Sequence, residues 1–173
     1  KKQNTFLKSR DYSVSKKDFT IVKCIDCKFL FTNPRPEERD MGDYYISDNY
    51  ISHTNNKKGL FNYLYQIVRK HAIVTKTKLL INTSATRNHL DIGCGTGEFI
   101  NSCVKRNINC IGIEPSRIAR EKAINNYKLN VKADTDLNQF KNNSFDSVSM
   151  WHVLEHIYDI NNTISCLKNI IRE

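Results

Sequence analysis

Three glycines at alternate positions mark the segment Asp91-Ile92-Gly93-Cys94-Gly95-Thr96-Gly97, which lies between an apolar stretch and a helical one. Glycine has no Cβ, so it adopts positive φ readily and lets a ligand lie directly against the backbone. A helix after such a turn adds free N–H groups that attract polar ligand atoms. The segment therefore predicts a strand, a ligand-binding turn and a helix. A dinucleotide-binding Gly-x-Gly-x-x-Gly turn is disfavoured, because Glu98 occupies its last position.

Short apolar stretches alternate with helical patterns from His89 onward, which is typical of a parallel sheet wound with crossover helices. The predicted fold class is therefore α/β. The expected strands cover residues 89–93, 109–113, 130–133 and 145–150. The expected helices cover residues 97–106, a segment that opens after Ser116, and the residues after the fourth strand.

The chain divides by texture into three regions, residues 1–45, 46–83 and 84–173. The first is polar, with strand-like stretches at Phe19–Val22 and Phe29–Phe31 and a turn at 33–36. The second holds a Tyr-rich loop and then a helix from about Leu60. Apolar residues recur every three or four positions in that helix and predict one packing stripe, formed by Leu60, Phe61, Leu64, Ile67, Val68 and Ala72.

Glu114 ends the second predicted strand, 17 residues after Gly97. The carboxyl edge of a parallel sheet is where ligands bind in open α/β folds. A carboxylate at this edge can accept hydrogen bonds from the two vicinal hydroxyls of a ribose. The alternative is that Glu114 only caps a surface helix.

The glycine turn and Glu114 together resemble the class I S-adenosylmethionine-dependent methyltransferases. The resemblance implies a Rossmann-like sheet, of which about four parallel strands are present, joined to an N-terminal Cys-containing segment by a helical connector. It implies that the turn holds the methionine end of S-adenosylmethionine, that Glu114 holds the ribose and that Asp134 binds the adenine amine. The cofactor-binding residues implied in this way are Asp91, Gly93, Cys94, Gly95, Gly97, Glu114, Pro115, Asp134, Thr135 and Trp151.

The segment Trp151-His152-Val153-Leu154-Glu155-His156 follows the fourth predicted strand and lies beside the sulfonium in the resembled family. Trp151 either offers an aromatic face to that cation or packs in the core. On a helix, the two histidines and Glu155 would project from one side. Such a face either binds a divalent metal ion, as in small-RNA methyltransferases, or shapes the pocket, as in ubiquinone-biosynthesis methyltransferases. His152 and His156 are also the candidate catalytic bases.

Cys24 and Cys27 have the two-residue gap with which one turn offers two thiolates to a zinc ion. A structural site needs four ligands, and no second pair lies nearby. The chain also resembles a bacterial methyltransferase subfamily that carries an upstream cysteine pair, so this resemblance implies a structural zinc ion where that pair exists. Lys28 departs from the subfamily, which has glycine there. The shared stretches are 10–15, 31–36, 44–45, 50–53 and 151–156.

The resembled fold has seven strands, whereas only four are expected here. An incomplete sheet leaves an unpaired edge and an open apolar face, which is costly and promotes association. We therefore expect the sequence to be a fragment of a longer protein, shortened at both ends and inactive on its own.

The formal net charge is +9, yet no basic run is longer than two residues. This spread disfavours nucleic acid as a partner without excluding it. No apolar run approaches the ~20 residues of a membrane-spanning helix. Together with six cysteines that we interpret as reduced thiols, these features predict a cytoplasmic protein with no membrane partner.

The leading hypothesis is transfer of a methyl group from S-adenosylmethionine to an O, N or C atom of a small molecule. The alternatives are an RNA methyltransferase, a binding module that holds S-adenosylmethionine without turnover, and a nicotinamide oxidoreductase, which Glu98 disfavours. Neither the acceptor nor the oligomeric state follows from the sequence.

Overall fold

A computed structural model describes residues 2–12, 14–37, 39–40, 44, 60–83 and 85–172. The chain forms two compact units, Lys1–Gly59 and Leu60–Glu173. The second unit begins upstream of the boundary at residue 84 that the sequence suggested, because the long helix packs with the residues that follow it. The motifs at Tyr45 and at residues 50–53 lie outside the described residues.

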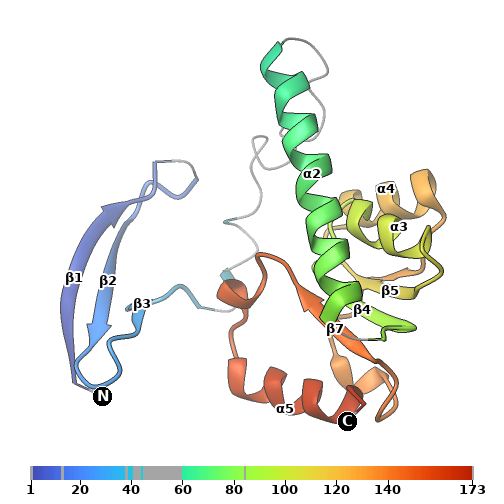
Figure 1. The fold of residues 1–173 in the computed structure, drawn as a ribbon. Coiled ribbons are helices and arrows are strands. Elements are labelled where there is room, and N and C mark those ends of the chain that lie inside the picture. Colours follow the sequence, from blue (N-terminus) through green and yellow to red (C-terminus); the bar gives the residue numbers. More distant parts are fainter. Residues whose placement is uncertain are drawn as a thin grey trace. The chain divides into compact units, whose positions relative to one another are not determined.

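The first unit contains an antiparallel sheet with the order β1-β2-β3, formed by β1 (Gln3–Arg10), β2 (Asp18–Cys24) and β3 (Leu30–Thr32) (Figure 1). The two strand-like stretches of the sequence are confirmed as β2 and β3. β1 was not expected. All eight of its residues are exposed, so backbone pairing with β2, rather than a buried apolar face, holds it in place.

The second unit contains a four-stranded parallel sheet, as the sequence predicted, and its strands lie in the order β6-β5-β4-β7. Its strands are β4 (Asn88–Ile92), β5 (Asn109–Ile113), β6 (Val131–Lys132) and β7 (Ser147–Met150). β7 begins two residues later than expected, because Phe145 forms only an isolated bridge with Ile171.

Helices cover both faces of this sheet (Figure 1). They are α2 (Leu60–Thr83), α3 (Glu98–Val104), α4 (Arg117–Tyr127) and α5 (Ile160–Ile170), with short 3-10 turns η2 (Leu137–Gln139) and η3 (Leu154–His156). Ser116 caps α4 by accepting a hydrogen bond from the Ala119 N–H, and Asp159 caps α5 in the same way.

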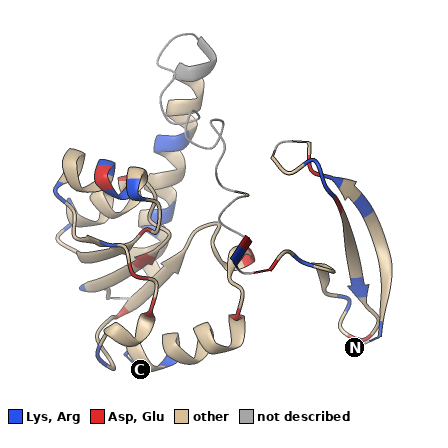
Figure 2. Cartoon of the chain, turned by 180° about the vertical axis from the view of Figure 1, so that it is seen from behind, with Lys and Arg blue, Asp and Glu red and all other residues tan. Residues whose placement is uncertain are grey.

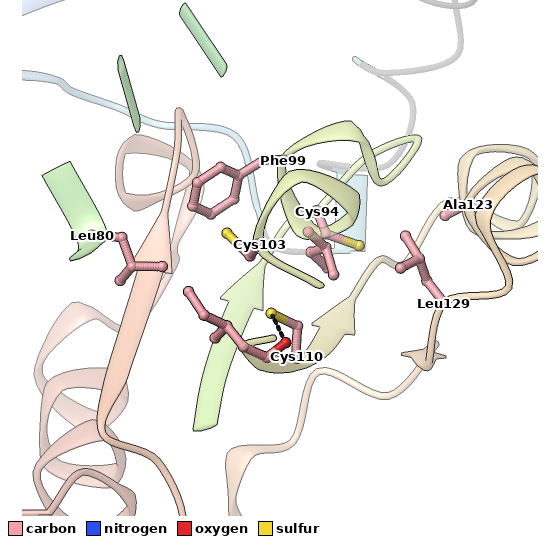
Figure 3. Close-up of a cluster of buried hydrophobic side chains, with 9 residues drawn as sticks. Leu80, Cys94, Phe99, Cys103, Cys110, Ala123 and Leu129 are labelled. Atoms are coloured by element: carbon pink, nitrogen blue, oxygen red, sulfur yellow. Dashed lines mark hydrogen bonds between the residues drawn. The ribbon is translucent and has the colours of Figure 1, made fainter. Parts of the chain in front are cut away.

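The sheet packs against helices through two apolar clusters, one on each face. There are two because successive residues of a strand point to opposite faces of the sheet. One cluster joins α2, α3 and α4 to the face that carries Cys110 (Figure 3). The other joins α5 and η2 to the face that carries Leu90 and Ile113. The sheet is therefore the middle layer of three.

The predicted helix from Leu60 is confirmed. Its predicted packing stripe is wrong at four positions whose side chains are exposed: Leu64, Ile67, Val68 and Ala72. α2 instead packs through its C-terminal half, where Thr77 and Leu80 are buried. A helix of this length spans about 36 Å, well beyond the sheet it covers. The spacing of apolar residues therefore could not show which turns of α2 pack against the core.

Lys and Arg are distributed over the strands and helices of both units without forming one basic stripe in the described part of the chain (Figure 2). No helix among the described residues is both long enough and apolar enough to span a bilayer.

Candidate cofactor site

The candidate site lies at the carboxyl ends of the parallel strands. It is next to β4, on one side of which the chain adds β5 and β6 and on the other side β7. The connection from β4 to β5 runs through α3 on one face, whereas β7 lies on the opposite side of β4 and leads to α5 on the other face. Loops therefore diverge between β4 and β7. Ligands of open α/β sheets bind at such a switch point.

The glycine turn after β4 is left-handed at all three glycines, with φ values of 71° at Gly93, 56° at Gly95 and 84° at Gly97. A Cβ on Gly93 would lie 2.4 Å from Val153, and one on Gly97 would lie 2.6 Å from Leu129. A Cβ on Gly95 would meet nothing within 4 Å. Two glycines therefore permit close packing of the protein, and the middle one faces open space, as a ligand-binding turn requires.

Cys94 differs from its glycine neighbours because its thiol points into the core rather than toward the open side of the turn (Figure 3). A Cβ on Gly112 would lie only 2.7 Å from the Cys94 Sγ. Burial raises the pKa of the Cys94 thiol far above its ordinary value. Cys94 therefore presents only its backbone to a ligand at the turn.

Glu114 reaches the glycine turn directly. Its Oε2 accepts a hydrogen bond from the Gly95 N–H at 2.8 Å, and its Oε1 accepts one from the Ser116 N–H at 2.8 Å. Each carboxylate oxygen keeps a further lone pair. The turn after β4 and the acid after β5 thus meet at one edge of the sheet, with acceptor capacity left for a ligand's hydroxyl groups.

Asp91 lies beneath the turn and is 2% exposed. Its Oδ1 accepts a hydrogen bond from the Ser149 hydroxyl of β7. Burial raises the pKa of Asp91 to about 7, while the Ser149 hydrogen bond and the positive charge of Lys76 oppose that rise. A carboxyl group with this pKa changes charge near neutral pH.

Trp151 is partly buried at the edge of the core, at the end of β7. The Lys76 Nζ lies 4.5 Å from its ring centroid, and the Phe99 ring contacts it edge to face at 5.6 Å. Its Nε1 is buried without a hydrogen-bond partner among the described residues. Trp151 therefore packs against the core, and its ring already binds the ammonium of Lys76.

An ion pair ties α2 to the glycine turn. Arg69 lies 2.7 Å from Glu98, and the Thr96 hydroxyl donates to the same carboxylate at 2.7 Å. All three groups are only partly exposed, so solvent screens the pair less than a surface pair. Glu98 thus has a structural role, in addition to occupying the position at which a dinucleotide-binding turn would have glycine.

A sequence profile described as a methyltransferase domain matches residues 50–173, most of the chain. The chain belongs to this methyltransferase family. The match begins upstream of α2, and the second compact unit begins at Leu60, the first residue of α2. α2 therefore lies within the stretch that matches the methyltransferase domain.

Solved structures share the fold of this methyltransferase domain. Magnesium protoporphyrin IX methyltransferase from Synechocystis PCC 6803, solved with bound SAM, matches with a TM-score of 0.56 and 15% identity, over 80% of this chain and 73% of that one. A SAM-dependent methyltransferase from Archaeoglobus fulgidus matches with a TM-score of 0.51 and 24% identity, over 60% and 48%.

The YcgJ protein from Bacillus subtilis matches with a TM-score of 0.51 and 20% identity, over 56% of this chain and 46% of that one. The methyltransferase domain therefore spans about half the length of the Archaeoglobus and Bacillus proteins. Identities this low show a shared fold and no more. Among curated proteins, none matches the chain in sequence.

The predicted adenine side of the methyltransferase domain follows β6. Asp134 is exposed, and its Oδ1 accepts a hydrogen bond from the Asp136 N–H at 2.9 Å. Thr135 is also exposed, and the Pro115 carbonyl accepts a hydrogen bond from Arg120. β6 pairs with β5 in parallel, so Asp134 and Thr135, which follow β6, lie at the same edge of the sheet as Glu114, which follows β5.

The prediction that His152, Glu155 and His156 share one helix face is wrong. His152 has a φ of 60° in a turn, and only Leu154–His156 form a short 3-10 turn. Both histidines lie 4.0 Å from the Glu155 carboxylate and are exposed. Among the described residues, no group of three or more His, Cys, Asp or Glu side chains is arranged to hold a metal ion.

Cys24 and Cys27 lie in a tight turn of the first unit. The Lys28 N–H donates to the Cys24 carbonyl at 3.1 Å, and the N–H groups of Cys27 and Asp26 lower the pKa of the Cys24 thiol. Lys28 has a φ of 64°, the left-handed conformation that glycine adopts most easily. Lys28 therefore adopts the backbone conformation that a glycine would adopt at this position.

Four residues around the site were not predicted from the sequence: Arg69, Lys76, His89 and Ser149. Arg69 and Lys76 lie on α2, and the sequence did not show which elements this helix packs against. The sequence does mark His89 and Ser149, because polar residues alternate with apolar ones along β4 and β7. A polar side chain inside a buried strand requires a hydrogen-bond partner.

Replacing Asp91 with Asn tests the buried charge. The stability that a carboxyl group with a raised pKa contributes is present below pH 3.8 and lost as the pH rises through about 7. From pH 5 to pH 8.5 this loss is about 3 kcal/mol. The free energy of unfolding of Asp91→Asn relative to wild type should therefore rise by about that amount over this range.

Urea unfolding of both proteins at the two pH values measures this difference. Burial also lowers the pKa of His89 to about 4, and the stability that His89 contributes is present above pH 6.5 and lost as the pH falls through about 4. Comparing the two proteins at each pH removes that shared contribution. An equal difference at both pH values would contradict the raised pKa of Asp91.

Proposed function

We propose that this methyltransferase domain binds S-adenosylmethionine and transfers its methyl group to an O, N or C atom of a small molecule. The observation that carries the proposal is the 2.8 Å hydrogen bond from the Gly95 N–H to the Glu114 carboxylate. It joins an open glycine turn to an acid with spare acceptor sites, which fits the methionine and ribose parts of one nucleoside.

Residues of two strand ends would hold the cofactor. Asp91 and the backbone at Gly93, Gly95 and Gly97 would bind the methionine part, and Glu114 would accept hydrogen bonds from the ribose hydroxyls. Asp134 and Thr135 would border the adenine. When bound, S-adenosylmethionine supplies an activated methyl group on a sulfonium. The protein therefore mainly positions two reactants, and an acid–base pair is not obligatory.

Calorimetry with S-adenosylhomocysteine tests the proposal directly. We expect binding with a dissociation constant below the millimolar range and a stoichiometry of one. A methyl-transfer assay on candidate acceptors then separates an enzyme from a module that only binds the cofactor. If millimolar S-adenosylhomocysteine produces no heat change beyond dilution, the cofactor assignment fails.

An RNA acceptor is the alternative for the substrate. The described Lys and Arg residues form no continuous stripe (Figure 2), so the small-molecule acceptor is favoured. A steep loss of RNA affinity with rising salt would reverse this preference, because it would reveal several phosphate contacts.

The roles of His152 and His156 as catalytic bases, the zinc site at Cys24 and Cys27, and the cytoplasmic location all stay predictions. The Cys24 turn supports half of a zinc site and nothing further. Metal analysis of a longer protein with an upstream cysteine pair would test it, and one zinc per chain is the expected result.

A further inference from the structure

A chain of hydrogen bonds runs along the partly buried interface of β4 and β7 and ends at the buried Asp91. The Thr86 hydroxyl donates to Ser147 at 3.1 Å, and the Ser147 Oγ lies 2.7 Å from His89 Nδ1. The His89 Nε2 lies 2.9 Å from the Ser149 Oγ, which donates to Asp91 Oδ1 at 2.5 Å. His89 is fully buried, and its ring packs edge to face on Phe99 (5.8 Å).

When Asp91 is ionised, this chain of hydrogen bonds assigns one tautomer to His89. Ser149 gives its only proton to Asp91, so the Ser149 Oγ must accept a proton from His89 Nε2–H. A neutral imidazole then leaves Nδ1 as an acceptor for the Ser147 hydroxyl. Every donor in the chain therefore points toward Asp91, which is the arrangement that an ionised carboxylate stabilises. A protonated Asp91 would favour the reverse arrangement.

We propose that His89, acting through Ser149, is a positioning residue that holds Asp91 ionised and oriented for the ammonium group of the bound methionine moiety. This inference rests on the proposed cofactor site. Asp91 is the group that would touch the cofactor, whereas His89 and Ser149 act from beneath it and never meet the ligand.

The surroundings of Asp91 make such support necessary. Burial among apolar groups disfavours its charge, as does the carboxylate of Glu114. Within the described part of the chain, Lys76 is the one group that offers Asp91 an opposing positive charge. The remaining titratable neighbours that feel its charge are the thiols of Cys94, Cys103 and Cys110. A hydrogen bond from Ser149 therefore shifts the balance toward the carboxylate near neutral pH, and an arriving ammonium group shifts it further, with release of a proton.

NMR of the ligand-free chain tests the proposal without any cofactor. At pH 9 we expect His89 to carry its proton on Nε2. In Ser149→Ala the titration midpoint of the Asp91 carboxyl should rise by about 1 pH unit, because a hydrogen bond to a charged group is lost. Ser149→Thr keeps the hydroxyl and should stay near wild type. The same contrast is expected between His89→Phe and His89→Gln, which retains an N–H donor.

An Nδ1–H tautomer in the unmodified chain would overturn the proposal, and this measurement decides the question even if Ser149→Ala or His89→Phe fails to fold. An unmoved Asp91 midpoint in both folded variants would overturn it equally.

Calorimetry with S-adenosylhomocysteine between pH 6 and pH 9 provides the functional readout. The affinity of Ser149→Ala should be about fivefold below wild type at pH 7 and nearly equal to it at pH 9, as a midpoint displaced by about 1 unit requires. An equal loss at every pH would mean a merely structural role and contradict the proposal. If the unmodified chain binds nothing although its His89 tautomer is as expected, the proposed function fails instead, and the assigned ligand with it.

Discussion

Replacing Glu114 with Gln should weaken S-adenosylhomocysteine binding by about 100-fold or more, because a hydrogen bond to a charged group contributes about 1.5–3 kcal/mol and two ribose hydroxyls are involved. The substitution also disturbs the empty site. The Gly95 and Ser116 N–H groups each need an acceptor, and the amide of Gln offers only one oxygen. Calorimetry at neutral pH measures the loss.

Glu121→Gln is the matched control for this measurement. Glu121 pairs at 2.8 Å with Arg117, which lies one turn earlier in α4, and both side chains are exposed. Its replacement removes the same charge without touching the turn, so the affinity should stay within about twofold of wild type. A Glu114→Gln protein that is folded and binds within threefold of wild type would remove the ribose assignment.

Replacing Gly97 with Ala should lower the free energy of unfolding by about 2–5 kcal/mol. About 1–2 kcal/mol comes from placing an L-residue in the left-handed region, and about 1–3 kcal/mol from overpacking. The new Cβ would lie 2.6 Å from Leu129 and 2.8 Å from the Cβ of Ala123, and the Ala123 Cα at 3.3 Å cannot rotate away. We expect the melting temperature to fall by about 5–15 °C.

Gly95→Ala separates backbone strain from packing. Its φ is also positive, but its Cβ would meet no atom within 4 Å, so only the strain of about 1–2 kcal/mol applies. S-adenosylhomocysteine affinity should fall in this variant by at least about tenfold, because the Cβ projects where the ligand is proposed to lie. Thermal melts and calorimetry on both variants measure the contrast. Equal melting temperatures for the two would show that Gly97 is not closely packed.

Much of the parallel sheet could be predicted from local patterns. Each strand of this sheet contains apolar residues in a short segment between two connections, and β5 begins and ends where the sequence placed it. The glycine turn was equally readable, since the need for positive φ and close approach restricts the residue type at each position. Glu114 followed because parallel strands bring their carboxyl ends to one edge.

Features that depend on a partner could not be predicted in the same way. β1 shows no apolar alternation because its partner is the backbone of β2. Apolar residues recur every three or four positions along α2, yet only the helical turns that contact the core of the second unit bury their side chains. His152 does not lie in the expected helix, because it adopts a left-handed φ of 60° in the turn that follows β7. The spacing of residues in the sequence does not encode this conformation.

The sequence by itself determined the alternation of strands and helices, the ligand-binding turn and the acid that faces it, because these depend on local backbone preference and on strand direction. Only the tertiary structure decided that His89, Ser149 and Asp91 form one buried chain of hydrogen bonds. Those residues come from two strands separated by more than fifty positions. Their contact depends on the order in which the strands pair, and so does the charge that Asp91 can carry.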